Sequence, residues 1–342
     1  MAAKKMQEFY PKYVVAGKIS RDFVIPFHGS PKLDLLGGAA AFTAAGLALW
    51  DKPVGILTRI GEDYPREQLR EFADYEIDTR GVKILQESLD LRSFYGYNGE
   101  GSYQTQSPVG MFADLQYPFP MALLNYKPEK ITRDDLHTRS LTSPISSDLP
   151  ADYLDAIAAH ICPMEYLTQS LLQAALHGGQ IRTITLEAHP AYLIPENWKV
   201  IPNVVSGLTA FIVEEEYIRQ LFRGRSNDLA EFAAGIGNMG CEQVIIRLDN
   251  GGKYLYQHST KQKWMIPEYP VRKLNVHSSR HAFCGGFLAG YLNSYDPVKA
   301  ALHGNISESM ASESLHPCGI FDALPGLAQT RLDVLKEKVK LL

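Results

Sequence analysis

The residues of this chain best suited to chemistry lie in one short segment near its C-terminal end, where two histidines flank a Ser-Ser-Arg tripeptide. His277 and His281 are four residues apart, a spacing that on a helix can hold a metal ion. No third ligand is evident nearby and the Arg280 guanidinium would repel a cation, so a metal site is not expected here. An imidazole titrates near pH 6.5 and suits proton transfer, while an arginine can pair with phosphate oxygens.

Glycines and other small residues gather in three further segments. Gly37 and Gly38 precede an alanine-rich run, and small residues at a helix start allow close approach of a ligand or a neighbouring strand. Segment 282–290 is a similar small-residue helix that can press tightly on a sheet. Segment 235–240 matches G-x-G-x-x-G, but a dinucleotide loop should follow a strand and open a helix. Here the order is reversed, so we interpret this segment as a helix C-terminus.

The composition fits a protein with a full hydrophobic core. The chain has 342 residues, of which 45% are hydrophobic, and a net charge of -4. One large α/β domain over residues 1–342 is therefore expected, and a strongly basic face for nucleic acid is not. No apolar run approaches the roughly 20 residues of a membrane-spanning helix, and the N-terminus does not resemble a secretory signal. We expect a cytoplasmic protein with no nucleic-acid or membrane partner.

The cysteines give no sign of a metal or redox centre. They are widely spaced and form no C-x-x-C pair, which favours buried, reduced thiols. The four positions are Cys162, Cys241, Cys284 and Cys318.

Strand and helix patterns alternate from about residue 150 onward, which is typical of a mainly parallel sheet covered by helices on both faces. Residues 92–106 have the pattern of a hairpin with a Gly-rich turn, and residues 254–256 and 263–266 indicate another. The other predicted strands are 13–16, 54–57, 159–162, 182–186, 210–213 and 244–248. The predicted helices are 36–50, 66–73, 167–176, 214–222, 229–236, 282–292 and 297–312.

Several of these segments, taken in order, resemble the ribokinase-like (pfkB) carbohydrate kinases. No single segment is decisive, but the ordered set spans residues 12–340. The matching segments are GKISRD at 17–22, GG at 37–38, VGILTRIGED at 54–63, EEE at 214–216, AFCGGF at 282–287 and GIFDALP at 319–325.

The resemblance implies a ribokinase-like fold, in which a mainly parallel sheet carries helices on both faces and a small sheet forms a lid over the substrate. The lid here would come mainly from residues 17–36 and 90–110, and in this family the lid is often a dimer surface. The resemblance also implies a sugar or nucleoside as the small-molecule ligand. An active enzyme would need ATP and Mg²⁺, and an inactive one would need no cofactor.

On the substrate side, the family's early Asp, which hydrogen-bonds substrate hydroxyls, corresponds to Asp22. A carboxylate suits that role because it accepts from two hydroxyls at once. The family's di-glycine corresponds to Gly37 and Gly38. Phe42 stands where the family usually has an Asn facing the sugar, which removes a polar contact and fills volume. Asp22, Gly38 and His281 are expected to line one cleft.

The nucleotide side departs from the family pattern. The Asn of the family's N-x-x-E motif, which organises water and Mg²⁺ around the phosphates, corresponds to Val213, while the Glu survives as Glu216. Upstream of Gly252, the family's Thr-x-Gly is replaced by a segment with Arg247 and Asp249 at its ends. A carboxylate where glycine approaches ATP would repel phosphate.

The largest departure is at the catalytic loop, where the family has Gly-Ala-Gly-Asp at a helix N-terminus. There the backbone N–H groups and the helix dipole stabilise charge on the transferring phosphoryl group, and the Asp takes the proton from the attacking hydroxyl. The matching residues here are Ser278, Ser279, Arg280 and His281. Both glycines and the acidic base are absent.

Three hypotheses follow. The first is a catalytically degenerate homologue that keeps the fold with little or no kinase activity. The second is an active ATP-dependent sugar or nucleoside kinase in which His281 replaces the base and Arg280 contacts phosphate. The third is a scaffolding subunit that associates through the lid, as a homodimer for example. This third hypothesis rests on a set of aromatic lid residues, and the alternative is that these residues pack over the cleft. They are Phe94, Tyr95, Tyr97 and Tyr103.

Overall fold

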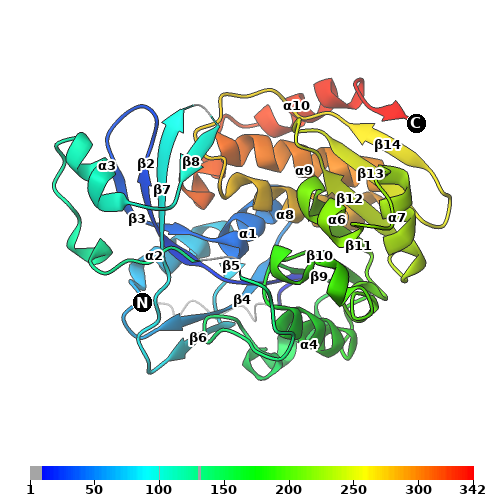
Figure 1. The fold of residues 1–342 in the computed structure, drawn as a ribbon, viewed down its shortest axis with the longest axis horizontal. Coiled ribbons are helices and arrows are strands. Elements are labelled where there is room, and N and C mark those ends of the chain that lie inside the picture. The colour runs from blue at the N-terminus through cyan, green and yellow to red at the C-terminus, as the bar shows by residue number, and fades with distance from the viewer. Residues whose placement is uncertain (1–9, 100, 130–131) are drawn as a thin grey trace, which may run out of the picture.

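The computed structural model describes residues 10–99, 101–129 and 132–342 and arranges them as a large sheet, a small sheet and surrounding helices (Figure 1). The strands from β12 to β5 run parallel to their neighbours, whereas β13, β14 and β15 are antiparallel. The order across the 11-stranded sheet is β15 (Lys340–Leu341), β14 (Lys263–Ile266), β13 (Lys253–Gln257), β12 (Gln243–Arg247), β11 (Ala210–Glu214), β10 (Thr183–Glu187), β9 (Ala158–Ile161), β1 (Tyr13–Ala16), β4 (Val54–Gly61) and β5 (Ile77–Asp78), with β6 (Val82–Leu85) beside β4. The predicted mainly parallel sheet is confirmed.

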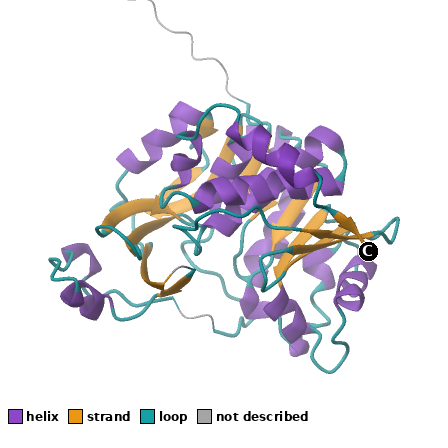
Figure 2. Ribbon diagram, turned by 90° about the horizontal axis from the view of Figure 1, so that it is seen from above, coloured by secondary structure: helices purple, strands orange, loops and turns teal. Residues whose placement is uncertain are grey.

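Helices cover both faces of this sheet (Figure 2). The helices are α1 (Ala39–Ala48), α2 (Glu67–Arg70), α3 (Pro108–Asp114), α4 (Tyr166–His177), α5 (Pro202–Val205), α6 (Glu215–Leu221), α7 (Leu229–Asn238), α8 (Ser279–Ser294), α9 (Pro297–Ser312) and α10 (Leu327–Lys336). Successive side chains of a strand point to opposite faces. In β1, Val14 and Ala16 therefore join the core under α4 and α7, and Tyr13 and Val15 join the core under α1 and α8.

The small sheet stands apart from the main one and contains the hairpin predicted for residues 92–106. Its order is β3 (Lys32–Gly37), β2 (Ser20–Ile25), β7 (Arg92–Gly99) and β8 (Ser102–Gln104). One face is apolar, because Phe23 and Phe94 pack with Phe112 of α3 in a separate cluster. The opposite face carries Asp22 and Tyr95, which are two residues apart in register along paired strands.

Two predicted helices differ from the structure. The helix predicted for 36–50 begins only at Ala39, because β3 continues through Gly37 and Gly38 has a positive φ of 90°, a conformation that ends a strand and that glycine adopts without strain. The helix predicted for 66–73 is only one α-helical turn, α2, followed by the 3₁₀ segment η1 (Glu71–Tyr75). The other predicted helices and strands are present, with ends that shift by a few residues.

The small-residue segment of α8 presses chiefly on another helix. Helix α8 lies against α1, where an added Cβ on Gly285 would clash with the carbonyl oxygen of Thr43, and one on Gly46 would clash with that of Ala282. The two helices are therefore in backbone contact. This contact fixes the position of the N-terminal turn of α8, which carries the Ser-Ser-Arg-His segment.

The remaining sequence expectations concern cysteines, membrane spans and the glycine motif. All four cysteines are free and buried, as predicted. Segment 235–240 forms the end of α7 and the connection to β12, which confirms its interpretation as a helix C-terminus. Within the described ranges, no helix is both long enough and apolar enough to cross a membrane.

The α1–α8 contact yields a stability prediction. Replacing Gly285 with Ala forces the two helix backbones apart, so we expect a loss of about 1–3 kcal/mol in the free energy of unfolding, measured by urea denaturation. Gly110 is a matched control, since it lies in α3 with open space around its Cβ position. Gly110→Ala should be neutral or slightly stabilising. Equal stability of the two variants would contradict the close contact.

Candidate active site

Charged side chains gather where three neighbouring parallel strands end. Glu187 is the last residue of β10, Glu214 of β11 and Arg247 of β12. Because these strands are parallel and adjacent, their carboxyl ends lie on one edge of the sheet, which is where open α/β sheets bind ligands. The N-terminal turn of α8, with Arg280 and His281, lies on the same edge.

Glu187 is the centre of a buried charge network. The Nη1 of Arg247 donates to Glu187 Oε1 at 2.5 Å and to Glu214 Oε1 at 3.1 Å. Its Nη2 donates to the backbone oxygen of Arg280 at 2.9 Å. Burial acts to raise the pKa of Glu187, but Arg247 and His281 hold that pKa well below its usual range. The carboxylate therefore stays ionised inside the protein.

His281 is oriented by this carboxylate. Its Nδ1 lies 2.7 Å from Glu187 Oε2, and an ionised carboxylate can only accept, so Nδ1 carries the proton. In the neutral ring the lone pair is then on Nε2. An imidazole fixed in one tautomer by a carboxylate is the arrangement of a general base.

The helix N-terminus of the family's anion-binding loop persists despite the loss of both glycines. Ser278 is the N-cap residue of α8 and Ser279 is its first residue, and both are buried. The Ser278 side chain does not cap this helix end. Asn275 Oδ1 accepts from the Ser278 N–H at 3.0 Å, and the Ser278 carbonyl accepts from the His281 N–H at 3.1 Å, so any anion-binding character is confined to the N–H groups of Ser279 and Arg280. Arg280 is 42% exposed at its side chain and lies 3.6 Å from Glu214.

The substrate-side residues lie together, but they are closed off. The Asp22 side chain is 0% exposed and accepts a hydrogen bond from Ser20 at 2.5 Å. A Cβ on Gly37 would clash with the Asp22 carboxylate, so Gly37 is required for this packing, and Gly38 starts α1 beside it. Phe42 is buried in the apolar core, and its place beside a substrate stays a prediction.

His277 covers Asp22. Its Nε2 is 3.8 Å from Asp22 Oδ2, an oxygen that finds no hydrogen-bond partner in the described part of the chain, and its ring stacks on Tyr95 with centroids 3.6 Å apart. The Tyr97 hydroxyl accepts from the N–H of Val276 at 2.8 Å and lies 2.8 Å from His277 Nδ1. If that hydroxyl donates to Nδ1, the ring proton is on Nε2 and points at Asp22.

The sequence signals for these two histidine–carboxylate contacts are weak. The spacing of His277 suggests only a metal ligand, and no motif marks Glu187. The one available signal is that Glu187 is a charged residue ending an otherwise apolar predicted strand, since a charge at such a position requires a partner. Nothing local indicates that its partners are Arg247 and His281.

The nucleotide-side residues do not form one group. Val213 is buried in β11, and Arg247 faces Glu187 in the interior. Glu216 and Asp249 are exposed. The N–H of Gly252 donates to Asn250 Oδ1 at 3.0 Å within a tight turn.

One cluster of metal-type ligands lies in this network. His160, Glu187 and Cys284 each offer a ligand atom, and these atoms lie within 4.8 Å of one another. The Glu187 charge is already neutralised by Arg247, and burial lowers the pKa of His160 to about 3. A cation here would have to displace or face the Arg247 guanidinium, so we assign no metal to this cluster.

Comparison with known proteins agrees with this architecture. No protein-family model matches the chain. A cytidine kinase from Thermococcus kodakarensis is 26% identical over 282 residues, which cover 81% of this chain and 87% of the relative. The nucleoside kinase of Methanocaldococcus jannaschii, an archaeal member of the ribokinase family, has a TM-score of 0.64 at 14% identity and covers 94% of this chain and 98% of its own. A fructokinase with bound ATP from Xylella fastidiosa has a TM-score of 0.66 at 15% identity, over 96% of this chain and 99% of its own.

The fold is therefore that of the ribokinase-like α/β kinases, with a large mixed sheet between helices and a separate small sheet. The sequence and structure neighbours of this chain are sugar and nucleoside kinases of the ribokinase (pfkB) family. The resemblance and the fold class inferred from the sequence are both confirmed.

The buried network generates a second prediction. Glu187→Gln keeps the shape of the side chain but removes the main counter-charge of Arg247. Removing one partner of a buried ion pair lowers the free energy of unfolding by about 3–5 kcal/mol. The pKa of Glu187 is depressed in the folded state. The ionised carboxylate therefore contributes its full stabilisation above the ordinary glutamate pKa of about 4.3. That stabilisation is lost as the pH falls through the pKa of Glu187 in the folded protein. Urea unfolding at pH 7 and at lower pH measures both effects.

A surface ion pair provides the control. Asp333 pairs with Lys336 on α10, and both side chains are exposed, so Asp333→Asn should leave the free energy of unfolding unchanged. If Glu187→Gln were as stable as this control, the network would not be a determinant of the fold.

Proposed function

We propose that this chain is a homologue of the sugar and nucleoside kinases that keeps their fold but has lost most or all phosphoryl transfer. One observation carries the proposal, namely that the Asp22 carboxylate is sealed beneath His277. By resemblance, Asp22 would receive substrate hydroxyls. A hydroxyl could reach it only if His277 left its stack on Tyr95 and its contact with Tyr97, so an internal side chain takes the place of the substrate.

The catalytic loop supports the same conclusion. The family's acidic base is replaced by His281, and Glu187 holds that ring inside the charge network. Losing a positioned base costs on the order of 10²–10⁴-fold in rate, and losing one donor of an anion hole costs about 10²–10³-fold. Such effects are rarely additive, but either one alone would leave a slow enzyme.

The nucleotide side fits ATP and Mg²⁺ poorly. Arg247 is engaged by two carboxylates and is buried, so it offers no charge to a phosphate. Asp249 and Glu216 are exposed and acidic, and Val213 presents no polar atom. Phosphate oxygens at this edge would meet net negative charge, so these residues do not support a catalytic step through the nucleotide.

The ligand class that remains is a sugar or a nucleoside, in keeping with the cytidine kinase and fructokinase neighbours. The scaffolding hypothesis receives less support from the lid aromatics. Phe94 and Tyr97 are buried and Tyr95 is covered by His277, and of these four residues only Tyr103 is exposed, at 37%. A homodimer through the lid would have to use other residues.

The second candidate is an active kinase with His281 as its base. The observation in its favour is the 2.7 Å contact between His281 Nδ1 and Glu187, which fixes the ring in a base-like tautomer. The N–H groups of Ser279 and Arg280 at the start of α8, with the half-exposed Arg280 side chain, would then bind the transferring phosphoryl group.

A paired binding and activity experiment separates the two candidates. We expect calorimetry with Mg²⁺ and up to millimolar ATP to detect no binding, and a panel of sugars and nucleosides to show no saturable phosphorylation, because the nucleotide edge lacks free positive charge. His277→Ala is run in parallel. It should unmask Asp22 and create or strengthen binding of a sugar or nucleoside without creating ATP turnover.

The opposite outcome is equally defined. Saturable, ATP-dependent phosphorylation by the unmodified protein would overturn the proposal of a degenerate kinase. If that activity also disappears in His281→Ala while ATP binding is retained, the second candidate is correct. If it survives His281→Ala, the base lies elsewhere and both candidates are wrong.

A further inference from the structure

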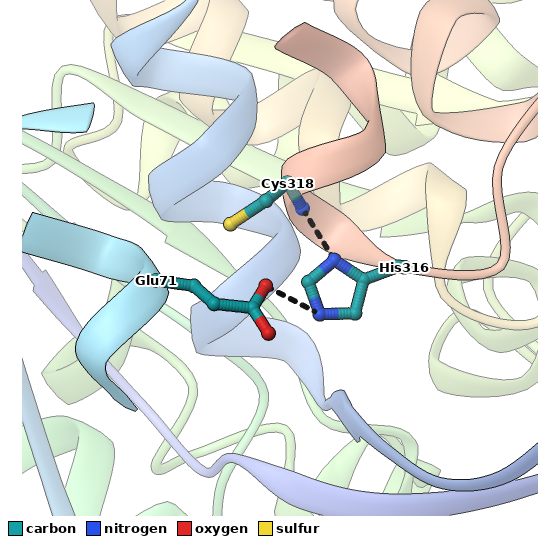
Figure 3. Close-up of side chains that lie close together, drawn as sticks. All are labelled: Glu71, His316 and Cys318. Atoms are coloured by element: carbon teal, nitrogen blue, oxygen red, sulfur yellow. Dashed lines mark hydrogen bonds and ion pairs between the residues drawn. The ribbon is translucent and has the colours of Figure 1, made fainter. Parts of the chain in front are cut away.

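A cluster of metal-type ligands lies outside the candidate active site, beside α1. Glu71 of η1, His316 just before the 3₁₀ segment η7 (Pro317–Phe321) and Cys318 within it converge there, and their ligand atoms lie within 4.8 Å of one another. Figure 3 shows the Glu71 carboxylate turned toward the His316 ring, with the Cys318 side chain beside them. We propose that these three side chains form a binding site for Zn²⁺ or a similar thiophilic divalent ion.

The spacing of the ligand atoms suits a tetrahedral ion. Two N or O ligands at about 2.0–2.1 Å from zinc are about 3.3 Å apart at the tetrahedral angle. The observed separation of His316 Nε2 and Glu71 Oε2 is 3.2 Å. The Cys318 side chain is buried in the apolar cluster that packs on α1, which fixes its position beside the other two ligands. Three protein ligands leave a fourth position for water.

The surroundings favour a cation. Two further carboxylates, those of Asp74 and Asp322, lie near the group. Negative charge around a site raises the local concentration of cations. The site is also accessible, since the Glu71 side chain is 51% exposed and that of His316 is 23% exposed.

The donor set selects the class of metal. Thiolate and imidazole favour Zn²⁺ and other borderline or soft ions, whereas Mg²⁺ and Ca²⁺ prefer oxygen ligands. The buried group of His160, Glu187 and Cys284 has the same three residue types but contains the Arg247 counter-charge. The Glu71 carboxylate instead pairs with His316, which is itself one of the three ligands, and this is why we assign the ion to this group.

Metal binding requires two protons to move. The Cys318 thiol must lose its proton to solvent, because the thiolate is the ligand. The N–H of Cys318 donates to His316 Nδ1 at 3.2 Å, so the neutral ring holds its proton on Nε2. When the ion takes Nε2, that proton transfers to Nδ1 and this long hydrogen bond is given up.

The bound ion would join two distant parts of the chain. Glu71 follows α2, and the other two ligands lie 245 residues or more further along, just after α9. Tyr75 and Phe321 already stack at 4.0 Å between the same two 3₁₀ segments. Zinc would therefore clamp the C-terminal segment to the body of the protein. At a free Zn²⁺ concentration about a hundredfold above Kd, we expect a rise in Tm of about 4 °C.

Cobalt provides a direct test of the proposed ligands. The full chain is stripped with a chelator and titrated with Co²⁺, and we expect one equivalent to bind with the thiolate-to-cobalt charge-transfer absorption that marks a sulfur ligand. Zn²⁺ should displace it. Cys318→Ser should abolish the charge-transfer band, and Glu71→Gln should weaken Zn²⁺ binding by more than about tenfold, since even outer-shell changes cost 10–100-fold.

Two variants serve as controls. Glu67→Gln removes an equivalent exposed carboxylate one turn before Glu71 and should bind Zn²⁺ like the unmodified protein. Cys284→Ser removes the thiol of the buried group and should keep the cobalt band. The absence of a charge-transfer band, an unchanged affinity in Glu71→Gln, or loss of the band in Cys284→Ser but not in Cys318→Ser would each overturn the proposal. Circular dichroism of every variant confirms that it is folded.

Discussion

The arrangement of the candidate site depends on burying the Glu187 carboxylate. Moving an ion from water into the protein interior costs several kcal/mol even after the protein relaxes around it. The Glu187 carboxylate can therefore stay ionised only if its charged partners are held in place. Arg247 comes from a strand two positions away in the sheet, and His281 comes from the start of α8. The carboxylate therefore determines the side-chain positions at the ends of β10 and β12. Arg247, which it fixes, holds the helix start by donating to the Arg280 backbone oxygen.

A second carboxylate extends the same constraint to the small sheet. His277 and His281 lie on either side of one helix start, and they face Asp22 and Glu187 respectively. Asp22 belongs to the small sheet and Glu187 to the main sheet. The segment from 277 to 281 therefore links the two sheets through two histidine–carboxylate contacts, and the tyrosine stack on His277 strengthens the link. This segment therefore holds the small sheet against the main body.

Local patterns in the sequence are sufficient to predict most of the fold. The strand at Tyr13–Ala16 and the helix at Pro297–Ser312 have the predicted ends. Gly17 follows the strand, and Asp296 caps the helix that begins at Pro297. The site is predicted less well. Motif position places Phe42 and Arg247 against ligands, but their side chains face the core and a carboxylate. Long-range pairing decides these orientations, and no local pattern records which distant residue will be the partner.

The charge balance of the site explains why its departures from the kinase pattern belong together. Two carboxylates, Glu187 and Glu214, are matched by the two guanidinium groups of Arg247 and Arg280. A transferring phosphoryl group carries negative charge, which must be met by positive charge that is not already neutralised.

The backbone N–H groups at the start of α8 still carry partial positive charge, but the charged side chains around them are paired with one another. Arg280 adds a charge where the family has glycine, and the carboxylate of Glu214 lies beside it. The substitutions thus produce a network of charged groups that neutralise one another. This network stabilises the fold, but phosphoryl transfer would require the same positive groups to be unpaired.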